Sequence, residues 1–209
     1  MPIILHKNIE PEGEVGVWKI EESEEWFRKR LDLYEEEKDA LSQIKGEGKR
    51  REWLASRWLL HEMSGRDVRG ACLKDAFGKP HLAESDYEIS LSHSDKIAAV
   101  MASPNPCGVD IQLKVEKITR LAKRFVNEYE QNWIESVQSI EDLHLIWGAK
   151  EALYKTYSKG KVDFINDLRI VNVDRKNKTA TGIITKLDEL HCTLQYEWIK
   201  NYLLVYAQL

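Results

Sequence analysis

Hydrophobic and polar residues alternate along several short stretches of the chain. A period of two is that of a half-buried β-strand, and a short continuous apolar run such as IAAVMA is typical of a fully buried one. The stretches are residues 3–9, 15–20, 87–94, 97–102 and 108–112, then 168–173, 179–185, 191–199 and 202–209. The pattern therefore predicts strands in both halves of the chain.

In other segments, hydrophobic residues recur every three to four positions. In GKRREWLASRWLLHEMSG (48–65), Trp53, Leu59 and Met63 fall on one broad face, which predicts an amphipathic helix. Ser23 is placed as the N-cap of a shorter helix. A basic helical run is expected over 118–137, and a second long helix from Ser139 to Gly160, because Ser139 and Asp142 have capping-box spacing.

The break SPNPCG (103–108) contains two prolines and a glycine, which favours a boundary there. We expect an N-terminal α+β half over 1–104 and a C-terminal α+β half over 105–209. Trp53, Ala55 and Leu59 recur as Trp147, Ala149 and Leu153, each the same number of positions further on. The expected fold class is thus α+β, with duplicated helix-plus-antiparallel-sheet units related by a pseudo-twofold, in a monomer.

Composition narrows the class of protein. The 209 residues are 43% hydrophobic and 32% charged, a globular balance, and the net charge of -4 argues against nucleic acid and anionic membranes as partners. The three cysteines lack metal or redox spacing, and the chain shows neither a signal peptide nor a membrane span. These features predict a cytoplasmic protein with reduced thiols.

Charged residues interrupt the second long helix at WGAKEALYK, which carries Lys150, Glu151 and Lys155. A solvated pair between Glu151 and Lys155, one turn apart, is one explanation. A second comes from Asp110 in the apolar strand GVDIQ, where a buried carboxylate needs a cation or hydrogen-bond donors. An exposed Asp110 is the alternative. If Asp110 and Glu151 converge, they form a site for Mg²⁺. This ion is usually held by one or two carboxylates together with substrate phosphates.

Four motifs in this order resemble the 4'-phosphopantetheinyl transferases of the surfactin-synthetase type. The strongest are Gly108-Val109-Asp110 and the helical set of Trp147, Lys150, Glu151, Ala152 and Lys155. The others are Gly78-Lys79-Pro80 and Ser92-His93-Ser94. The resemblance covers about residues 50–160 by motif, and the whole chain by length and strand order.

The resemblance implies transfer of the 4'-phosphopantetheine arm of coenzyme A to a serine of an apo acyl or peptidyl carrier protein, with release of 3',5'-ADP. It also implies two similar α+β halves with coenzyme A in the cleft between them. Asp110 and Glu151 would hold Mg²⁺, and Glu151 or a water beside it would be the base. Lys155 would contact the phosphate under attack, and Lys150 the pyrophosphate or nucleotide.

The nucleotide end of coenzyme A would meet residues of the first half. Lys79, Ser92 and His93 are its implied ligands, although a turn histidine bonded to nearby backbone is the alternative for His93. Arg50 and Arg57 are weaker candidates for the 3'-phosphate, and Arg51 is equally explained by a solvated helix face. The basic run Lys117, Arg120, Lys123 and Arg124 is either a docking surface for an acidic carrier protein or a solvated helix face.

The chain departs from the family at Gln112, where many members have a second acid two residues after the Asp. An amide oxygen brings no charge, so we expect Gln112 to bind Mg²⁺ weakly or through water, with a looser metal site. Two other functions remain open: a non-catalytic coenzyme A or nucleotide-binding module, and a metal-dependent nucleotide phosphohydrolase. The presence of Glu151 and Lys155 argues against the former, and dependence on a carrier protein separates transfer from the latter.

Overall fold

The computed structural model describes residues 3–133, 139–186 and 189–209. The chain divides into two compact units, one ending at Asn105 and the other beginning at Pro106. Within the described residues, none of the helices combines the length and the apolar character that crossing a membrane requires. Each unit combines helices with one antiparallel sheet, which confirms the predicted α+β class.

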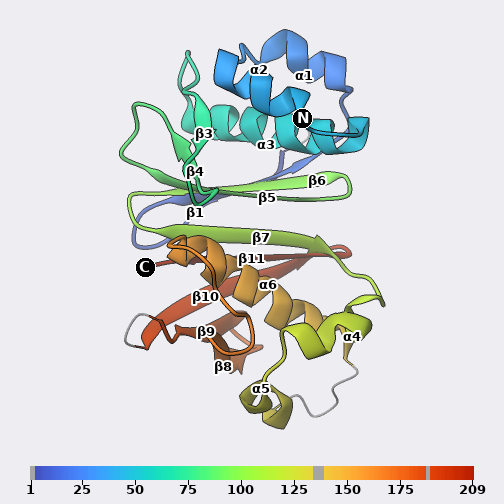
Figure 1. The fold of residues 1–209 in the computed structure, drawn as a ribbon, viewed down its shortest axis with the longest axis vertical. Helices are drawn as coiled ribbons and strands as arrows, with labels where there is room; N and C mark the ends of the chain where they lie inside the picture. Colours follow the sequence, from blue (N-terminus) through green and yellow to red (C-terminus); the bar gives the residue numbers. More distant parts are fainter. Residues whose placement is uncertain (1–2, 134–138, 187–188) are drawn as a thin grey trace. The chain divides into compact units, whose positions relative to one another are not determined.

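The first unit has a six-stranded sheet and three helices (Figure 1). The strands lie in the order β1-β2-β6-β5-β4-β3, and all neighbouring pairs are antiparallel. Their bounds are β1 Ile3–Asn8, β2 Glu14–Lys19, β3 Cys72–Lys74, β4 Pro80–Leu82, β5 Glu88–Ser94 and β6 Ile97–Ser103, and those of the helices are α1 Glu24–Arg30, α2 Glu35–Ser42 and α3 Glu47–Ser64.

Helix α3 forms where the 3.6-residue pattern predicts it. Leu54, Leu59 and Leu60 are buried in the core of the unit, together with residues of β2, β5 and β6. The helix ends at Gly65, whose φ of 61° is the left-handed conformation that glycine adopts without steric cost. The structure adds helix α2 and the short strands β3 and β4, none of which the sequence pattern predicted.

The second unit has a five-stranded sheet in the order β7-β11-β10-β9-β8, with α6 packed on it (Figure 1). The strand bounds are β7 Cys107–Leu113, β8 Leu168–Asp174, β9 Thr179–Ile184, β10 Leu190–Ile199 and β11 Tyr202–Gln208. The helices are α4 Ile118–Leu121, α5 Glu128–Trp133 and α6 Ile140–Tyr157, with a 3₁₀ turn at Ala122–Arg124. Leu143, Ile146 and Leu153 anchor α6 in the core.

The basic run over 118–137 is broken in the structure. Phe125 is fully buried, and a new helix begins after Asn127. The side chain of Asn127 accepts a hydrogen bond from the Glu130 amide, and Glu130 accepts one from the Asn127 amide, which is a reciprocal capping box. Two short helices replace one long one for this reason. The end of the predicted run, residues 134–137, lies outside the described residues.

The two units share one chain topology. In each, a strand (β2 or β7) is followed by short helices, an 18-residue helix and then four strands. The last of the four strands pairs with β2 or β7. The shared orders are β2-β6-β5-β4-β3 and β7-β11-β10-β9-β8, with β1 as an addition to the first unit. The repeat expected from Trp53 and Trp147 thus has a counterpart in strand order.

Candidate active site on β7 and α6

Two glycines allow α6 to approach β7 closely. A Cβ atom on Gly108 of β7 would lie 2.0 Å from the carbonyl oxygen of Ala152, and one on Gly148 of α6 would lie 2.5 Å from Nε2 of Gln112. Neither distance is sterically possible without movement. Because alternate residues of a strand share a face, Asp110 and Gln112 point to the same side of the sheet as Gly108, toward α6. The glycines therefore position the polar side chains of the two elements.

Asp110 is buried at the centre of this contact, with a relative exposure of 7%. Lys155, from the last turn of α6, places its Nζ 3.0 Å from Oδ1 of Asp110 and 2.8 Å from the carbonyl oxygen of Val109. The structure brings these predicted residues together. Lys155 pairs with Asp110 across the two elements, so a simple solvated pair between Glu151 and Lys155 does not describe the site.

Glu151 lies one turn before Lys155 on α6 and is partly buried. Burial, and to a smaller extent the negative charge of Asp110, raise the pKa of its carboxyl group to about 7, and the positive charge of Lys155 opposes the shift. The influence of Asp110 means that the two carboxylates repel each other within one low-dielectric site. An acid with a pKa near neutrality is suited to taking up and releasing a proton.

The structure corrects the expected role of Gln112. Its Nε2 group donates hydrogen bonds to Oδ2 of Asp110, at 3.2 Å, and to the carbonyl oxygen of His144, at 3.1 Å. Its Oε1 lies 2.6 Å from Nδ1 of His144. A cation at Asp110 would face an NH₂ group, which carries only donors. In this arrangement Gln112 supplies no oxygen to a metal.

His144 was not singled out in the sequence. It is buried in the first half of α6, with an exposure of 2%, and the amide of Val115 donates to its Nε2 at 3.0 Å. Burial lowers its pKa, and the Val115 carbonyl oxygen, 3.2 Å from Nε2, acts in the opposite direction. Nothing in the local sequence distinguishes this histidine, because its partners, Gln112 and Val115, lie about thirty positions away.

Lys150 is also corrected by the structure. Its side chain is fully buried, and its Nζ lies 2.9 Å from Oε1 of Glu130 and donates to the carbonyl oxygens of Phe125 and Phe164. Burial lowers the pKa of Lys150 and raises that of Glu130, and the attraction between the two charges opposes both shifts. Every donor of the amine thus has a partner inside the protein. We therefore assign Lys150 a structural role in place of the expected phosphate contact.

Glu130 was missed in the sequence, although its spacing from Asn127 is that of a capping box. Besides the Asn127 amide, it accepts a hydrogen bond from the Ile170 amide at 2.9 Å. It therefore connects α5, α6 and β8.

The candidate nucleotide ligands of the first unit each have an acidic or structural partner. Lys79 forms an ion pair with Glu88. His93 is partly exposed, and its Nδ1 lies 2.9 Å from Oε2 of Glu52, so a carboxylate holds the ring in place. Arg50 pairs with Glu24 at 2.9 Å, and Ser92 is buried within β5. A phosphate would have to compete with the carboxylates for Lys79, His93 and Arg50.

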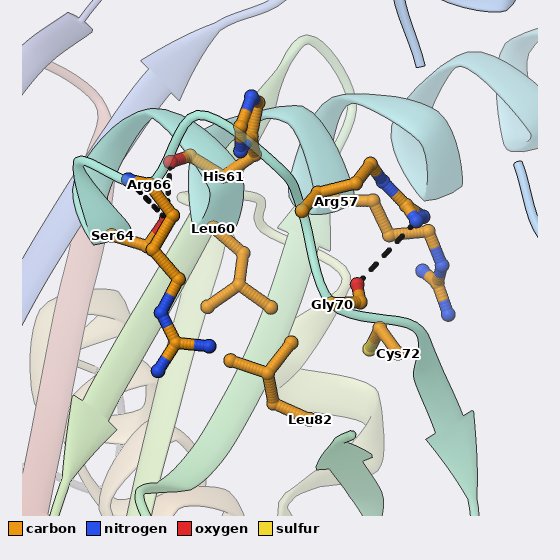
Figure 2. Close-up of a pocket in the computed structure, with 9 residues that line it drawn as sticks. Arg57, Leu60, His61, Ser64, Arg66, Gly70, Cys72 and Leu82 are labelled. Atoms are coloured by element: carbon orange, nitrogen blue, oxygen red, sulfur yellow. Dashed lines mark hydrogen bonds between the residues drawn. The ribbon is translucent and has the colours of Figure 1, made fainter. Parts of the chain in front are cut away.

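Arg57 lies inside the first unit, beside a small hollow between α3 and the chain leading into β3 (Figure 2). Only 4% of Arg57 is exposed. Its guanidinium stacks 3.3 Å from the centre of the Trp53 ring, and its Nε is 3.8 Å from the buried carboxylate of Glu37, which also pairs with Arg69. Burial lowers the pKa of Arg57 to about 10, so the group remains charged at pH 7. The expected contact with the 3'-phosphate is replaced by an internal structural role.

The donor set at β7 and α6 suits a hard divalent cation. Asp110 and Glu151 supply carboxylate oxygens, and their mutual repulsion is the kind that a bound cation relieves. Among the described residues, no group of three or more His, Cys, Asp or Glu side chains forms a complete metal cage. Two carboxylates without such a cage fit Mg²⁺, which usually keeps several waters and takes its remaining ligands from substrate phosphates.

Comparison with known proteins agrees with this site. Residues 106–207, which form almost the whole second unit, match the 4'-phosphopantetheinyl transferase superfamily. A relative, the 4'-phosphopantetheinyl transferase gsp of Aneurinibacillus migulanus, is 28% identical over 149 residues, covering 70% of this chain and 59% of the relative. The chain thus spans less than two thirds of that relative's length. Together with the motifs, these matches show that the part of the chain that carries Asp110, Glu151 and Lys155 is similar to the 4'-phosphopantetheinyl transferase superfamily.

Proposed function

We propose that the protein transfers the 4'-phosphopantetheine arm of coenzyme A to a serine hydroxyl of an apo acyl or peptidyl carrier protein and releases 3',5'-ADP, with Mg²⁺ as cofactor. The observation that carries the proposal is the meeting of Asp110, Glu151 and Lys155 at one contact between β7 and α6. These residues lie within the part of the chain that matches the family.

Glu151 is the proposed general base. Without a cation its pKa is about 7, so it is partly ionised at neutral pH, and a bound cation would increase the ionised fraction that can accept the proton of the serine hydroxyl. The serine oxygen then forms a bond to the phosphorus of the phosphopantetheine arm, and the bond from that phosphorus to the oxygen of the 3',5'-ADP group breaks. Lys155 is held beside Asp110 and supplies positive charge for the phosphate oxygens.

Mg²⁺ held by Asp110 and Glu151 would neutralise negative charge on the diphosphate. Asp110 is suited to this role because its position is restrained by Lys155 on one oxygen and Gln112 on the other. In the first unit, Lys79, Ser92, His93 and Arg50 remain the proposed ligands of the nucleotide end.

The proposed docking surface for the carrier protein is the basic run around α4. Its four basic side chains are all exposed and therefore available to a partner: Lys117, Arg120, Lys123 and Arg124. Positive charge there would attract an acidic helix and speed its association.

Mass spectrometry tests the proposal directly. Several apo carrier proteins are incubated with the full chain, coenzyme A and Mg²⁺, and we expect the mass of one phosphopantetheine arm to be added to the modified serine. Release of 3',5'-ADP is measured in parallel, with and without carrier protein. Release that needs the carrier supports transfer, whereas equal release without it would show a nucleotide phosphohydrolase. Binding of coenzyme A without release in any mixture would indicate a non-catalytic module.

A further inference from the structure

The hydrogen bonds around Gln112 determine which way its amide group points. The two neighbours of Nε2, the carboxylate of Asp110 and the carbonyl oxygen of His144, are both acceptors. If the amide were reversed, its oxygen would face two other oxygens without a hydrogen between them. Both amide hydrogens are therefore donated, and Oε1 is the atom that faces His144.

The same reasoning assigns the proton of His144. Oε1 of Gln112 can only accept, so Nδ1 of His144 carries the hydrogen between them. In the neutral ring Nε2 is then the acceptor of the Val115 amide, at 3.0 Å, and the Val115 carbonyl oxygen lies further away, at 3.2 Å. Nδ1–H then donates to Oε1 of Gln112, at 2.6 Å. A directed chain of hydrogen bonds results, from Val115 through His144 and Gln112 to Asp110.

The side chains of His144, Gln112 and Asp110, which these hydrogen bonds connect, are at least nine-tenths buried. Water therefore does not readily replace a lost partner. Each is also attached to one of the two elements that build the site: Asp110 and Gln112 to β7, and His144 to α6. The chain of hydrogen bonds thus couples the helix to the orientation of the strand carboxylate.

We infer that His144 is a positioning residue that acts through Gln112 to hold Asp110 in the orientation in which it binds the divalent cation. Gln112 works as a hydrogen-bond donor to the metal-binding carboxylate, and the site needs no third oxygen ligand from this position. The inference rests on the proposed function only in taking Asp110 as a ligand of the cation. Groups of this kind orient metal ligands, and their loss typically weakens metal binding by about 10- to 100-fold.

Two substitutions of His144 separate this role from simple packing. The side-chain amide of Asn reaches the position of Nδ1 of a histidine, and that of Gln reaches the position of Nε2. His144→Asn therefore keeps a donor for Gln112 and loses the contact with Val115, whereas His144→Gln does the reverse. Both variants remove the ring, so a role in packing alone affects them alike.

The measurement is Mn²⁺ binding to the full chain in the presence of coenzyme A, followed by the electron paramagnetic resonance of free Mn²⁺. We expect His144→Gln to bind Mn²⁺ about tenfold more weakly than the wild type, and His144→Asn to bind close to wild type. Equal affinity in the wild type and His144→Gln, or equal losses in both variants, would overturn the inference. Melting temperatures verify that each variant is folded.

Gln112→Leu provides a second route that leaves the histidine in place. It removes the donor to Asp110 and is expected to lose as much Mn²⁺ affinity as His144→Gln, with no further loss in the double variant, because both act on one chain of hydrogen bonds. Wild-type affinity in Gln112→Leu, or additive losses, contradicts the inference. If the wild type binds Mn²⁺ no better than Asp110→Asn, the proposed metal site itself fails, and the inference with it.

Discussion

At the scale of single residues, Glu151 has the most distinctive environment in the described part of the site. It is the carboxyl group whose pKa is raised to about 7 next to a second acid. A carboxyl group with this pKa is partly protonated at neutral pH, and a nearby cation stabilises its ionised form. Its neighbours Asp110 and Lys155 are held by direct hydrogen bonds, so the environment is built into the fold.

Glu151→Gln tests the role of this carboxyl group. We expect the turnover number to fall by at least about a hundredfold, since neither a base nor a charged metal ligand remains. The melting temperature should stay the same or rise, because the neutral amide removes the repulsion with Asp110. Steady-state kinetics and thermal denaturation measure the two quantities. A turnover number near that of the wild type would remove Glu151 from the mechanism.

Gln112→Glu tests the looser metal site expected from the sequence. A carboxylate at this position removes the amide donor to Asp110 but adds a charged oxygen ligand beside it. The added ligand should outweigh the lost donor, so the Mg²⁺ concentration that gives half-maximal activity should fall by about tenfold. Without metal, the added repulsion should lower the melting temperature, and Mg²⁺ should restore it more strongly than in the wild type. Titration of activity and melting temperature with Mg²⁺ measures both effects. An unchanged or higher requirement for Mg²⁺ would contradict the expectation.

At the scale of secondary structure elements, the site depends on how closely α6 lies on β7. Gly108 faces the backbone of α6, and the equivalent strand of the first unit has Gly16 facing Met63 and Leu59 of α3. Both units thus place a glycine against their long helix, from β2 in the first unit and from β7 in the second. The function of the glycine in the GVD motif is therefore steric, since it sets the separation at which Asp110 meets Lys155.

Gly108→Ala should force the two elements apart. The added Cβ would meet backbone atoms of Ala152 and Thr156, which cannot move without moving the helix, so we expect a loss of about 3 kcal/mol in the free energy of unfolding, together with loss of activity. Gly48→Ala is the matched control, since its Cβ would meet no atom within 4 Å and it lies in α3. It should be neutral or stabilising by up to about 1 kcal/mol. Urea denaturation compares the variants, and equal effects would refute the steric explanation.

The buried pair of Glu130 and Lys150 connects α5, β8 and α6. Glu130→Gln leaves the buried amine of Lys150 without a counter-charge, and we expect a loss of about 3–5 kcal/mol in the free energy of unfolding. The double variant Glu130→Gln, Lys150→Met should recover part of this loss, because no charge remains buried. Glu25→Gln, which breaks the exposed pair with Lys29, is the control and should have little effect. If the Glu130 and Glu25 variants behave alike, the buried pair has no structural importance.

In the molecule as a whole, both units follow one topology, but the proposed catalytic residues lie in the second. The first unit instead carries cations that are paired with acids, such as Lys79 with Glu88 and His93 with Glu52. With a net charge of -4, the protein has no general attraction for an acidic partner. If an acidic carrier protein is the partner, as proposed, its attraction has to come from a local surface such as the basic run at α4.

All three cysteines of the chain are buried and none forms a disulfide, and this gives a test of both units at once. Burial raises the pKa of Cys72, and raises that of Cys192 to about 11, so the thiolate fraction at pH 8 is below that of an exposed thiol. With the thiol reagent DTNB, we expect negligible labelling of the native protein in the first minutes and three equivalents after denaturation. Rapid labelling of any cysteine in the native state would contradict the described packing.

The fold class, the resemblance to the transferase family and the residue types of the candidate site could be predicted from the sequence alone. Periodicity predicted α3, α6 and most of the strands because it depends on neighbours a few positions away. The pairing of Asp110 with the helix motif was also accessible from sequence, through resemblance. Short elements such as β3 and α2 were not predicted, since a three-residue strand leaves almost no periodic signal.

The partner and the burial of each charged side chain depend on tertiary contacts. Lys150 and Lys155 lie five residues apart, which is about 140° around a helix, so one points into the core and the other toward β7. In sequence the two lysines look equivalent. The surroundings of Arg57, Gln112 and His144 depend on partners from other elements, such as Glu37 for Arg57 and His144 for Gln112, and burial depends on what packs over a side chain. Such contacts join distant parts of the chain, and local sequence carries no record of them.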